Sequence, residues 1–305
     1  MKEIHSPINK DNKLKAFLKC KDYTVSNEFF SIVEDSESEL LITTPCPNLE
    51  KLSSYYESED YISHTDAKKT LFDKVYQKAK NYAIKKKIKL IQKENKKTEN
   101  KNLLDIGCGT GDLLVAMNQQ NWNVIGIEPN KKARVLAKSK LGLLTSNFNN
   151  FEDVYPKIHE SVNAVEEKFD VITMWHVLEH VPNLEEYIVL LKQLLKPNGT
   201  LIIAVPNHKS YDAKHYGKFW AAYDVPRHLW HFSKKAMHLL FQKEKMRIEK
   251  TIPMKLDAFY VSLLSEKYKT GKSNLIKAFW YGLISNMKAK RTKEYSSLIY
   301  IIKNT

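Results

Sequence analysis

The stretch "LLDIGCGTGDLL", residues 103–114, places apolar residues directly before three closely spaced glycines. A short apolar run that meets a glycine cluster and then continues with apolar residues indicates a buried strand that turns into a helix. Turns of this kind hold nucleotides and nucleoside cofactors, because the backbone can approach the ligand closely where side chains are missing. The glycine spacing and the surrounding charges indicate which ligand.

The spacing of the glycines excludes two common ligand classes. The dinucleotide fingerprint requires a third glycine three positions after the second, for close packing of the helix on the strand. Here that position is Asp112, and the third glycine comes early, at Gly111, after Gly107 and Gly109. A P-loop is excluded as well, because no Gly-Lys-Ser/Thr follows.

Three carboxylates near the turn favour a cationic ligand. Asp105 ends the first strand, Asp112 begins the helix, and Glu128 ends the second strand, 21 residues after Gly107. Carboxylates repel a diphosphate but attract the ammonium and sulfonium groups of S-adenosylmethionine (SAM). Glu128 alone also suits NAD, since it can accept both ribose hydroxyl protons. Together the three acids favour SAM.

Strand and helix patterns alternate after the glycine turn. This order predicts an α/β fold, in which a parallel sheet carries helices on both faces. The predicted strands span residues 102–107, 123–129, 143–147, 169–175, 199–207, 246–252 and 296–303. The predicted helices span residues 65–92, 111–121, 131–142, 183–196, 233–244 and 273–290.

The ordered motifs "LLDIGCGTGDLL", "VIGIEPN", "FDVITMWHVLEHV" and "LLKPNGTLIIAVPN" resemble those of class I SAM-dependent methyltransferases. The resemblance covers roughly residues 65–250. It is strongest to the branch with ubiquinone-biosynthesis O-methyltransferases and small-molecule or sugar methyltransferases. It implies a doubly wound, Rossmann-like and mostly parallel seven-stranded sheet whose last strand is antiparallel.

The resemblance also implies the cofactor site. The glycine turn approaches the methionine part of SAM, Glu128 binds the ribose, and the residues after the third strand border the adenine. The predicted cofactor-binding residues are Asp105, Gly107, Cys108, Gly109, Gly111, Glu128, Pro129, Ser146, Asn147, Trp175 and His176.

The segment "WHVLEHV" places His176, Glu179 and His180 on one face of a helical turn. One interpretation is structural, with His180 holding a neighbouring loop by hydrogen bonds. A second makes His176 a general base, because the residue beyond the fourth strand faces the transferred methyl group. A third is a metal site, since ubiquinone-pathway enzymes carry a similar Glu-x-x-Glu-His stretch. His176 replaces the first glutamate here, which favours a softer metal or none, and we expect no metal.

The loop "GKFWAAYDVPRHLWHFS", residues 217–233, is rich in aromatic and histidine side chains. Loops beyond the carboxyl ends of parallel strands form the ligand crevice, and an aromatic wall with a few polar groups suits a small molecule. The predicted catalytic residues are His228 as the favoured base, with His176, His231, Tyr223 and Asp224. The structural alternative makes Trp220 and Trp230 core residues and pairs Asp224 with Arg227.

The chain is interpreted as two domains. Residues 1–64 form a ribbon-like appendage that covers the cofactor, in which the lone Cys20 and Cys46 cannot complete a tetrahedral zinc site. Residues 65–305 form the methyltransferase domain. Its helical insertion near 273–290 caps the substrate or forms a dimer contact, and the sequence leaves both options open.

Composition limits the partners. The net charge is +14, but 45 of the 49 basic residues are lysines, whereas arginine is the usual reader of bases and phosphates. No apolar run approaches the ~20 residues of a membrane span, so we expect no membrane partner, and the three scattered cysteines suggest the cytoplasm. We therefore expect methyl transfer from SAM to oxygen or carbon of a small molecule. The alternatives are an RNA or protein methyltransferase, with nucleic acid not favoured, and a non-catalytic SAM-fold protein.

Overall fold

A computed structural model describes residues 5–48, 51, 55, 71–95, 101–141 and 168–305. The chain divides into two units, each built from separate stretches of sequence. Unit 1 comprises Met1–Ser58, His176–Tyr187 and Ile203–Ile301, and unit 2 comprises Glu59–Trp175, Ile188–Ile202 and Ile302–Thr305. The two units are described separately below.

Six strands form the larger sheet in the order β5-β4-β6-β7-β10-β9. Strand β4 pairs in parallel with β5 and β6, so that Asp105 lies between Gly126 and Thr173. The sheet is mostly parallel and its C-terminal strands are antiparallel, which confirms the predicted fold class. The predicted third strand lies outside the described residues. The bounds are Asn102–Ile106 (β4), Asn123–Ile127 (β5), Phe169–Trp175 (β6), Leu195–Pro206 (β7), Met246–Pro253 (β9) and Ser297–Asn304 (β10).

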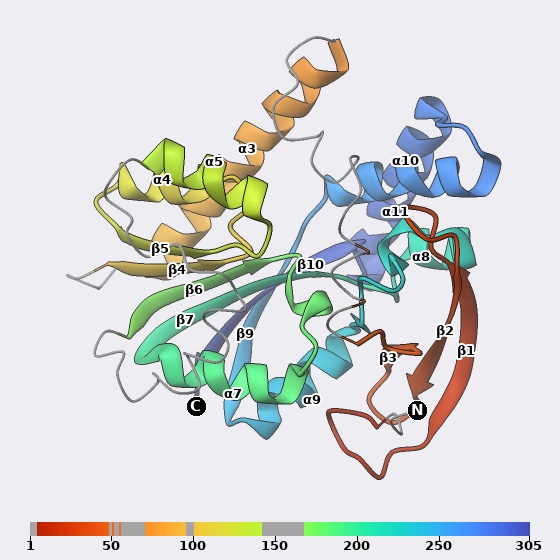
Figure 1. Cartoon of the computed structure of the whole chain (residues 1–305), viewed down its shortest axis with the longest axis horizontal. Coiled ribbons are helices and arrows are strands. Elements are labelled where there is room, and N and C mark those ends of the chain that lie inside the picture. The colour runs from red at the N-terminus through yellow and green to blue at the C-terminus, as the bar shows by residue number, and fades with distance from the viewer. Residues whose placement is uncertain (1–4, 49–50, 52–54, 56–70, 96–100, 142–167) are drawn as a thin grey trace. The chain divides into compact units, whose positions relative to one another are not determined.

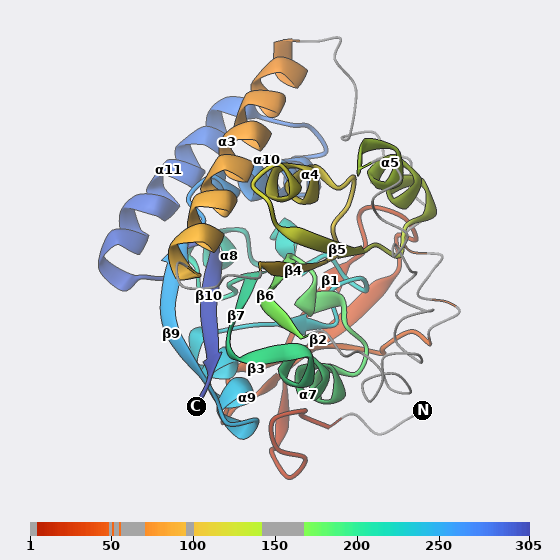
Figure 2. The same ribbon diagram turned by 90° about the vertical axis from the view of Figure 1, so that its left-hand side faces the viewer.

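The central strands are buried because both faces of the sheet are covered. Six of the seven residues of β6, "FDVITMW", are buried, the pattern of a strand that helices cover on both sides. Four helices accompany these strands: α3 (Leu71–Glu94), α4 (Asp112–Asn118), α5 (Lys131–Leu141) and α7 (Leu184–Leu194). In unit 2, α4 and α5 lie on the same side of β4 and β5 (Figures 1 and 2).

A second, four-stranded sheet belongs to unit 1. Its order is β1-β2-β3-β8, and the pairs that the structure records are antiparallel. Three strands come from the N-terminal segment: β1 (Leu14–Lys21), β2 (Phe29–Asp35) and β3 (Leu40–Thr44). The fourth, β8 (Trp230–His231), comes from the loop predicted to bind substrate, and its Trp230 pairs with Ile42. The N-terminal segment is therefore joined by backbone pairing to a loop almost 190 residues away.

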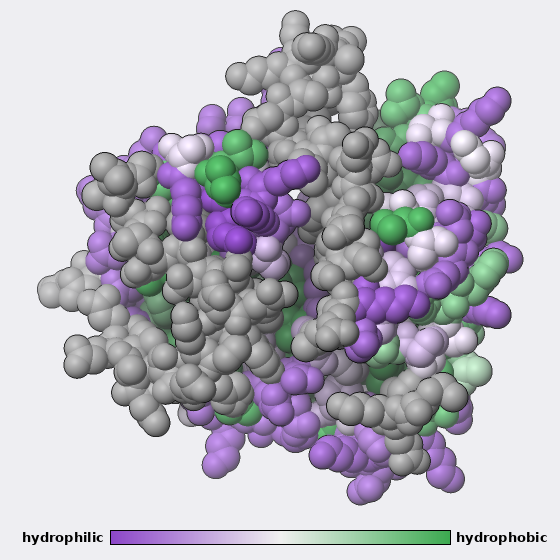
Figure 3. Space-filling model, in the orientation of Figure 1, coloured by the Kyte–Doolittle hydropathy of each residue, from purple (hydrophilic) through white to green (hydrophobic). Residues whose placement is uncertain are grey.

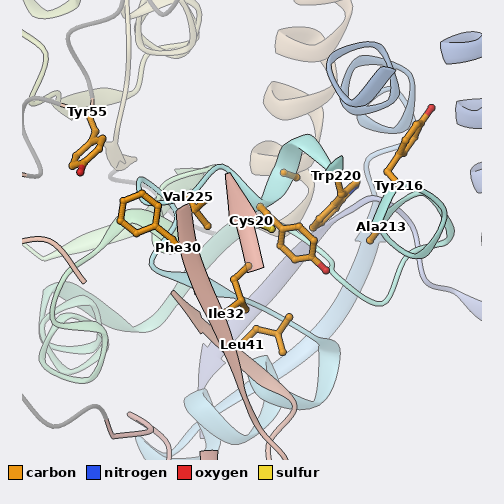
Figure 4. Close-up of a cluster of buried hydrophobic side chains, with 11 residues drawn as sticks. Cys20, Phe30, Ile32, Leu41, Tyr55, Ala213, Tyr216, Trp220 and Val225 are labelled. Atoms are coloured by element: carbon orange, nitrogen blue, oxygen red, sulfur yellow. The ribbon is translucent and has the colours of Figure 1, made fainter. Parts of the chain in front are cut away.

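The apolar sides of this small sheet share a core with the same loop. Figure 4 shows side chains from the three N-terminal strands among residues of the 213–225 segment. Trp220 is fully buried in this cluster, and its indole N–H donates to Asp212 Oδ2 at 2.8 Å. The buried members are Cys20, Phe30, Ile32, Leu41, Tyr55, Ala213, Tyr216, Trp220, Ala222, Tyr223 and Val225.

The described residues of unit 1 also form the helices α8 to α11 and several short helical turns. The predicted helices near 233–244 and 273–290 are confirmed as α9 (Lys234–Lys243) and α11 (Leu275–Thr292). The helical turn predicted in "WHVLEHV" includes the 3₁₀ turn η2 (Leu178–His180). Not predicted were α8 (Tyr211–Tyr216), α10 (Asp257–Thr270) and the 3₁₀ turns η3 (Gly217–Phe219) and η4 (Ala221–Tyr223). Among the described residues, no helix combines the length and the apolar character needed to cross a bilayer.

Candidate functional site

The glycine turn of unit 2 follows β4 directly. The amides of Gly107 and Cys108 both donate to the Ile127 carbonyl, at 2.7 and 3.1 Å, and fix the turn against β5. Gly107, Gly109 and Gly111 have φ angles of 72°, 55° and 75°. This left-handed region disfavours side chains with a Cβ. The path of the turn therefore requires glycine at all three positions.

Gly109 and Gly111 differ in what surrounds them. A Cβ on Gly111 would lie 2.9 Å from the Cβ of Ala137, so this glycine lets α4 begin against α5. A Cβ on Gly109 would meet no atom of the described residues within 4 Å. The backbone at Gly109 thus borders open space into which a ligand can approach, whereas Gly111 serves packing.

Glu128 holds the turn in place with both carboxylate oxygens. Oε2 accepts from the Gly109 amide at 2.8 Å, and Oε1 accepts from the Asn130 amide at 2.9 Å. Burial raises the pKa of Glu128, although these two amide bonds and the Arg134 charge oppose the shift. Each oxygen keeps a second lone pair. Glu128 can therefore accept two further hydrogen bonds from a ligand's hydroxyl groups.

Asp105 is buried at the end of β4. Its Oδ1 accepts from the Thr173 hydroxyl at 2.5 Å. Burial raises the pKa of Asp105 to about 6, and the Thr173 bond and the Lys87 charge only partly offset this effect. Desolvation destabilises the charged form of this carboxyl group. A cationic ligand close to Asp105 would favour the ionised carboxylate, and the two opposite charges would then attract each other.

Asp112 has protein partners for its charge. Lys80 and Lys140 lie 2.7 and 2.9 Å from its carboxylate, and the Thr110 hydroxyl donates to it at 2.8 Å. Burial alone would raise the pKa of Asp112, but these bonds outweigh it and lower the pKa. The prediction that Asp112 favours a cationic ligand is corrected accordingly. The electrostatic argument rests on Asp105 and Glu128.

The remaining predicted cofactor residues have mixed surroundings. Cys108 is buried, and burial raises the pKa of its thiol. The Pro129 carbonyl accepts from Arg134 at 3.0 Å. The indole of Trp175 lies under Lys87 Nζ at 4.2 Å, and its buried Nε1–H has no acceptor among the described residues. That donor is available to a ligand. The predicted adenine neighbours, Ser146 and Asn147, lie outside the described residues.

His176, in unit 1, has a φ of 59° and binds two carboxylates. Its Nε2 lies 3.0 Å from Asp257 Oδ2, and its Nδ1 lies 3.4 Å from Glu179 Oε1. Burial alone would lower the pKa of His176, but Asp257 and Glu179 outweigh it and raise the pKa to about 10. The imidazole is therefore protonated at neutral pH. A general base needs an unprotonated nitrogen, so this geometry argues against the predicted base role.

Glu179, His180 and His228 form a second cluster in unit 1. One ligand atom from each lies within 4.8 Å of the others. Glu179 is fully buried, and neither of its carboxylate oxygens has a hydrogen-bond partner among the described residues. A buried carboxylate without hydrogen bonds is costly unless another positive group compensates it. The cluster thus has the composition of a cation site, although the imidazole of His176, with its Nδ1 3.4 Å from Glu179 Oε1, already faces this carboxylate.

Backbone carbonyls fix both imidazoles of this cluster. His180 Nδ1 lies 3.0 Å from the Arg227 carbonyl, and His228 Nδ1 lies 2.9 Å from the Ala222 carbonyl. Since a carbonyl oxygen only accepts, each Nδ1 must carry a proton, and in the neutral form of each ring the lone pair is on Nε2. Metal-binding histidines are commonly oriented by such a bond through the other nitrogen. Two imidazoles and one carboxylate are also a ligand set that zinc enzymes use.

Three other predicted catalytic residues have structural partners in unit 1. Tyr223 is 3% exposed and packs in the hydrophobic cluster beside Trp220. Asp224 forms a bidentate ion pair with Arg227. His231 lies in β8, is buried, and has its Nε2 3.0 Å from the Thr43 hydroxyl. The Asp224–Arg227 pair matches the structural alternative for the loop, and the catalytic roles of Tyr223, Asp224 and His231 stay predictions.

Sequence patterns did not indicate several residues that support these sites. Thr173 lies opposite Asp105 in the parallel register of β4 and β6. This contact can be predicted only after the pairing of the two strands is known. Arg227 also donates to Asp22 and Thr24 in the N-terminal segment. Asp257 contacts His176 across 81 positions. Neither long-range contact has a local sequence signal.

Comparisons with known proteins agree with this geometry. A sequence model described as a methyltransferase domain matches residues 76–247. A ubiquinone biosynthesis O-methyltransferase of Histophilus somni is 36% identical over 125 residues, 40% of this chain and 51% of that protein. The corresponding protein of Dechloromonas aromatica is 28% identical over 180 residues, 58% and 75% of the two chains. The chain spans about half the length of most of these relatives.

One solved structure supports the fold. The magnesium protoporphyrin IX methyltransferase of Synechocystis PCC 6803, with bound SAH, aligns with a TM-score of 0.52 at 13% identity. The alignment covers 84% of this chain and all of that one. The family match spans more than half of the sequence and includes the whole glycine turn with Glu128. The chain therefore belongs to the methyltransferase-domain family.

Proposed function

We propose that the chain transfers a methyl group from SAM to a hydroxyl group of a small molecule. The proposal is supported by the family match and by the name of the curated relatives, which are O-methyltransferases. The observation that carries it is the Gly109–Glu128 pair, in which a buried carboxylate braces a backbone that borders open space. An acid at this position can bind ribose hydroxyls.

The residues of unit 2 fit SAM. Glu128 has lone pairs for two hydroxyl protons, and Trp175 has a buried indole N–H without an acceptor among the described residues. Gly109 offers an open approach to the backbone. Asp105 is a buried carboxyl group whose charge a cation would stabilise. Polar donors and acceptors with unused capacity, next to a turn free of side chains, suit a nucleoside that carries a positive charge.

SAM supplies an electrophilic methyl group on a sulfonium sulfur. The chain's task is to align this group with the acceptor and to exclude water, and well-oriented reactants can gain ~7–11 kcal/mol from proximity. In this proposal Glu128 fixes the ribose and the glycine turn at once. Asp105 compensates the positive charge of the cofactor.

The acceptor's proton requires a second group, and His228 is the favoured residue. Its Nδ1 donates to the Ala222 carbonyl, so its Nε2 lone pair can accept a proton. The same lone pair can instead bind a cation together with Glu179 and His180. These two uses exclude each other. A bound divalent cation would act as a Lewis acid and favour ionisation of a hydroxyl group.

We propose the cation use, because Glu179 lies with His180 and His228 in one cluster and, apart from its 3.4 Å ion pair with His176, its carboxylate makes no hydrogen bond among the described residues. The test is thermal unfolding of EDTA-treated protein with added Mg²⁺, Mn²⁺ or Zn²⁺. A cation at 100 times its Kd should stabilise the native protein by about 2.7 kcal/mol. We expect Glu179→Gln to abolish this shift and Glu185→Gln, an exposed control, to retain it. No shift with any cation would leave His228 as the base.

The methyl transfer is tested with isotopically labelled SAM and a cell extract separated into small molecules, RNA and protein. We expect label in the small-molecule fraction. Label confined to RNA or protein would overturn the small-molecule assignment, and no label in any fraction would favour a non-catalytic SAM-binding role. Steeply salt-dependent binding to bulk RNA would support the RNA alternative, because phosphate contacts release counterions.

A further inference from the structure

Helix α11 exposes large apolar side chains along one face. Ile276 is 84% exposed and Trp280 is 59% exposed, and three further apolar residues of the helix are also exposed. We define the apolar face by these five residues: Leu275, Ile276, Phe279, Trp280 and Met287. Contiguous exposed apolar residues of this kind mark interaction surfaces.

The five residues share one side of the helix. At 100° per residue they span an arc of about 140°. The adjacent side, centred about 120° away, carries the small residues Ala278, Gly282, Ser285 and Ala289, all of which are buried. A Cβ on Gly282 would lie 2.7 Å from the Phe259 ring, so α10 and α11 pack closely through the small side. The packing of this adjacent side leaves the apolar face exposed.

The surroundings of this face are strongly basic. Residues 255–293 contain nine lysines and arginines but only two acids, Asp257 and Glu266, so half of the chain's net charge of +14 comes from this segment. Glu266 is 3% exposed, and Asp257 pairs with His176. Most of the basic side chains are exposed, among them Lys272, Lys277 and Lys290. Figure 3 shows hydrophobic and hydrophilic residues interleaved over the region of α10.

We propose that the apolar face of α11 binds the surface of an anionic lipid bilayer. A helix that combines Trp, Phe, Leu and Ile on one side with neighbouring lysines lies in the bilayer interface, where apolar side chains enter the acyl boundary and lysines meet anionic headgroups. The charge favours this occupant over a second copy of the chain, because two copies would bring two strongly positive segments together. The proposal does not depend on the activity proposed above.

The helix is also preformed for this role. The Asn274 side chain caps its N-terminus by accepting from the Lys277 amide at 3.0 Å. The Phe259 and Phe279 rings stack with centroids 5.4 Å apart and connect the two helices beside the apolar face. A folded helix loses little conformational entropy when it binds a surface. The free energy gained by burying its aromatic side chains in the bilayer therefore contributes directly to membrane affinity.

The test is sedimentation of the full chain with phosphatidylcholine vesicles that contain 0% or about 30% phosphatidylglycerol. We expect partition into the anionic vesicles to be about tenfold stronger and to weaken with added salt, because the lysines near the apolar face attract anionic headgroups and salt screens this attraction. Trp280 fluorescence should shift to the blue on binding, and Trp280→Phe should remove this shift.

Variants of the apolar face and of a similarly exposed control residue test whether the chain binds the bilayer through α11. The double variant Phe279→Ser/Trp280→Ser should lower the partition coefficient about tenfold, whereas Phe29→Ser, an equally exposed aromatic on β2, should leave it unchanged. Lys290→Glu/Arg291→Glu should weaken binding to anionic vesicles only. Failure of the wild-type chain to bind anionic vesicles, or retained binding by the double variant, would overturn the proposal. So would a dimer in solution that the double variant converts to a monomer while neither form binds vesicles.

Discussion

The buried carboxyl group of Asp105 lowers the stability of the folded chain at high pH, but it can bind a cationic ligand. Its carboxyl group is 2% exposed, and burial raises its pKa from 3.8 to about 6. The folded chain therefore holds this proton more tightly than the unfolded chain does. The resulting stabilisation is complete below pH 3.8 and is lost as the pH rises through 6. A shift of about two units corresponds to a loss on the order of 3 kcal/mol.

Asp105→Asn should therefore stabilise the ligand-free protein at high pH. The amide can keep a bond with Thr173 but carries no buried charge, so we expect an increase of about 1–2 kcal/mol in the free energy of unfolding at pH 8. At pH 4 the two proteins should differ little. Urea denaturation at both pH values measures this. An equal difference at pH 4 and pH 8 would contradict the pKa shift.

The same substitution should weaken SAM binding. For the wild-type chain, affinity should fall as the pH decreases below 6, because a cation binds the ionised carboxyl group best. Asp105→Asn should bind more weakly at pH 8, and its affinity should depend less on pH. Calorimetric titration between pH 5 and 8 provides the measurement. Identical pH profiles for both proteins would exclude Asp105 from the SAM site.

Glu128→Ala removes a ligand contact and a brace of the turn. Loss of hydrogen bonds to a charged group costs about 1.5–3 kcal/mol, so SAM affinity should fall about 10- to 100-fold. The melting temperature should fall as well, since Gly109 and Asn130 lose an acceptor. Calorimetry and thermal unfolding measure the two effects. Glu185→Ala is the control, and equal SAM affinity in both variants would disprove the ribose role.

Residue types and spacing predicted the cofactor turn and the local Asp224–Arg227 pair, but not the long-range pairing of the polar residues in unit 1. The roles of Asp105, Glu128 and the glycines depend on neighbours along the chain or in adjacent strands. A local sequence pattern can therefore predict these roles. His176 lies against Asp257, and His228 lies with Glu179 and His180. These partners come together only when α10 and the 217–233 loop are folded, so no spacing rule could assign them.

Where the residues of an element follow one pattern throughout, the predicted bounds agree closely with the structure. The predicted strand 169–175 is β6 with the same bounds, because a buried parallel strand is apolar almost throughout. Helix α10 was missed because its buried residues, Ala258, Ser262, Ser265 and Glu266, include few apolar side chains. Its buried side lies against the small residues of α11. Periodicity of apolar residues is therefore a poor signal for this helix pair.

Two glycines of one turn should respond differently to the same substitution. Gly111→Ala places a Cβ 2.9 Å from Ala137 at a φ of 75°, so we expect a loss of about 2–4 kcal/mol in stability. Gly109→Ala meets no atom within 4 Å and should cost only about 1 kcal/mol of strain. Its Cβ would enter the open space beside Glu128, so its main effect should be weaker SAM binding.

Urea denaturation and SAM titration of both variants separate these effects. The double variant Gly111→Ala/Ala137→Gly should recover part of the lost stability, because it removes the clashing Cβ. Equal losses of stability in the two single variants would refute the distinction between packing and ligand approach.

At the scale of the whole molecule, unit 1 is assembled from three distant stretches of sequence. Arg227 connects them chemically: it pairs with Asp224 in its own loop and donates to Asp22, Thr24 and the Tyr55 carbonyl in the N-terminal segment. Strand β3 also pairs with β8. The interpretation of residues 1–64 as an appendage rests on their resemblance to the N-terminal zinc ribbon of related methyltransferases. Contacts this far apart leave no local pattern.

Removal of residues 1–64 should therefore destabilise unit 1 as a whole. The truncation would expose Trp220 and Val225, leave β8 without its partner strand, and deprive the buried Arg227 of Asp22. Loss of one partner of a buried ion pair alone costs about 3–5 kcal/mol. We expect an early unfolding transition in residues 65–305 by tryptophan fluorescence. Leu41→Ala in the full chain, which should cost about 2–5 kcal/mol, tests the same core if the truncated chain aggregates. A truncated chain with the melting temperature of the full protein, or an unaffected Leu41→Ala variant, would restore the interpretation of a separate appendage.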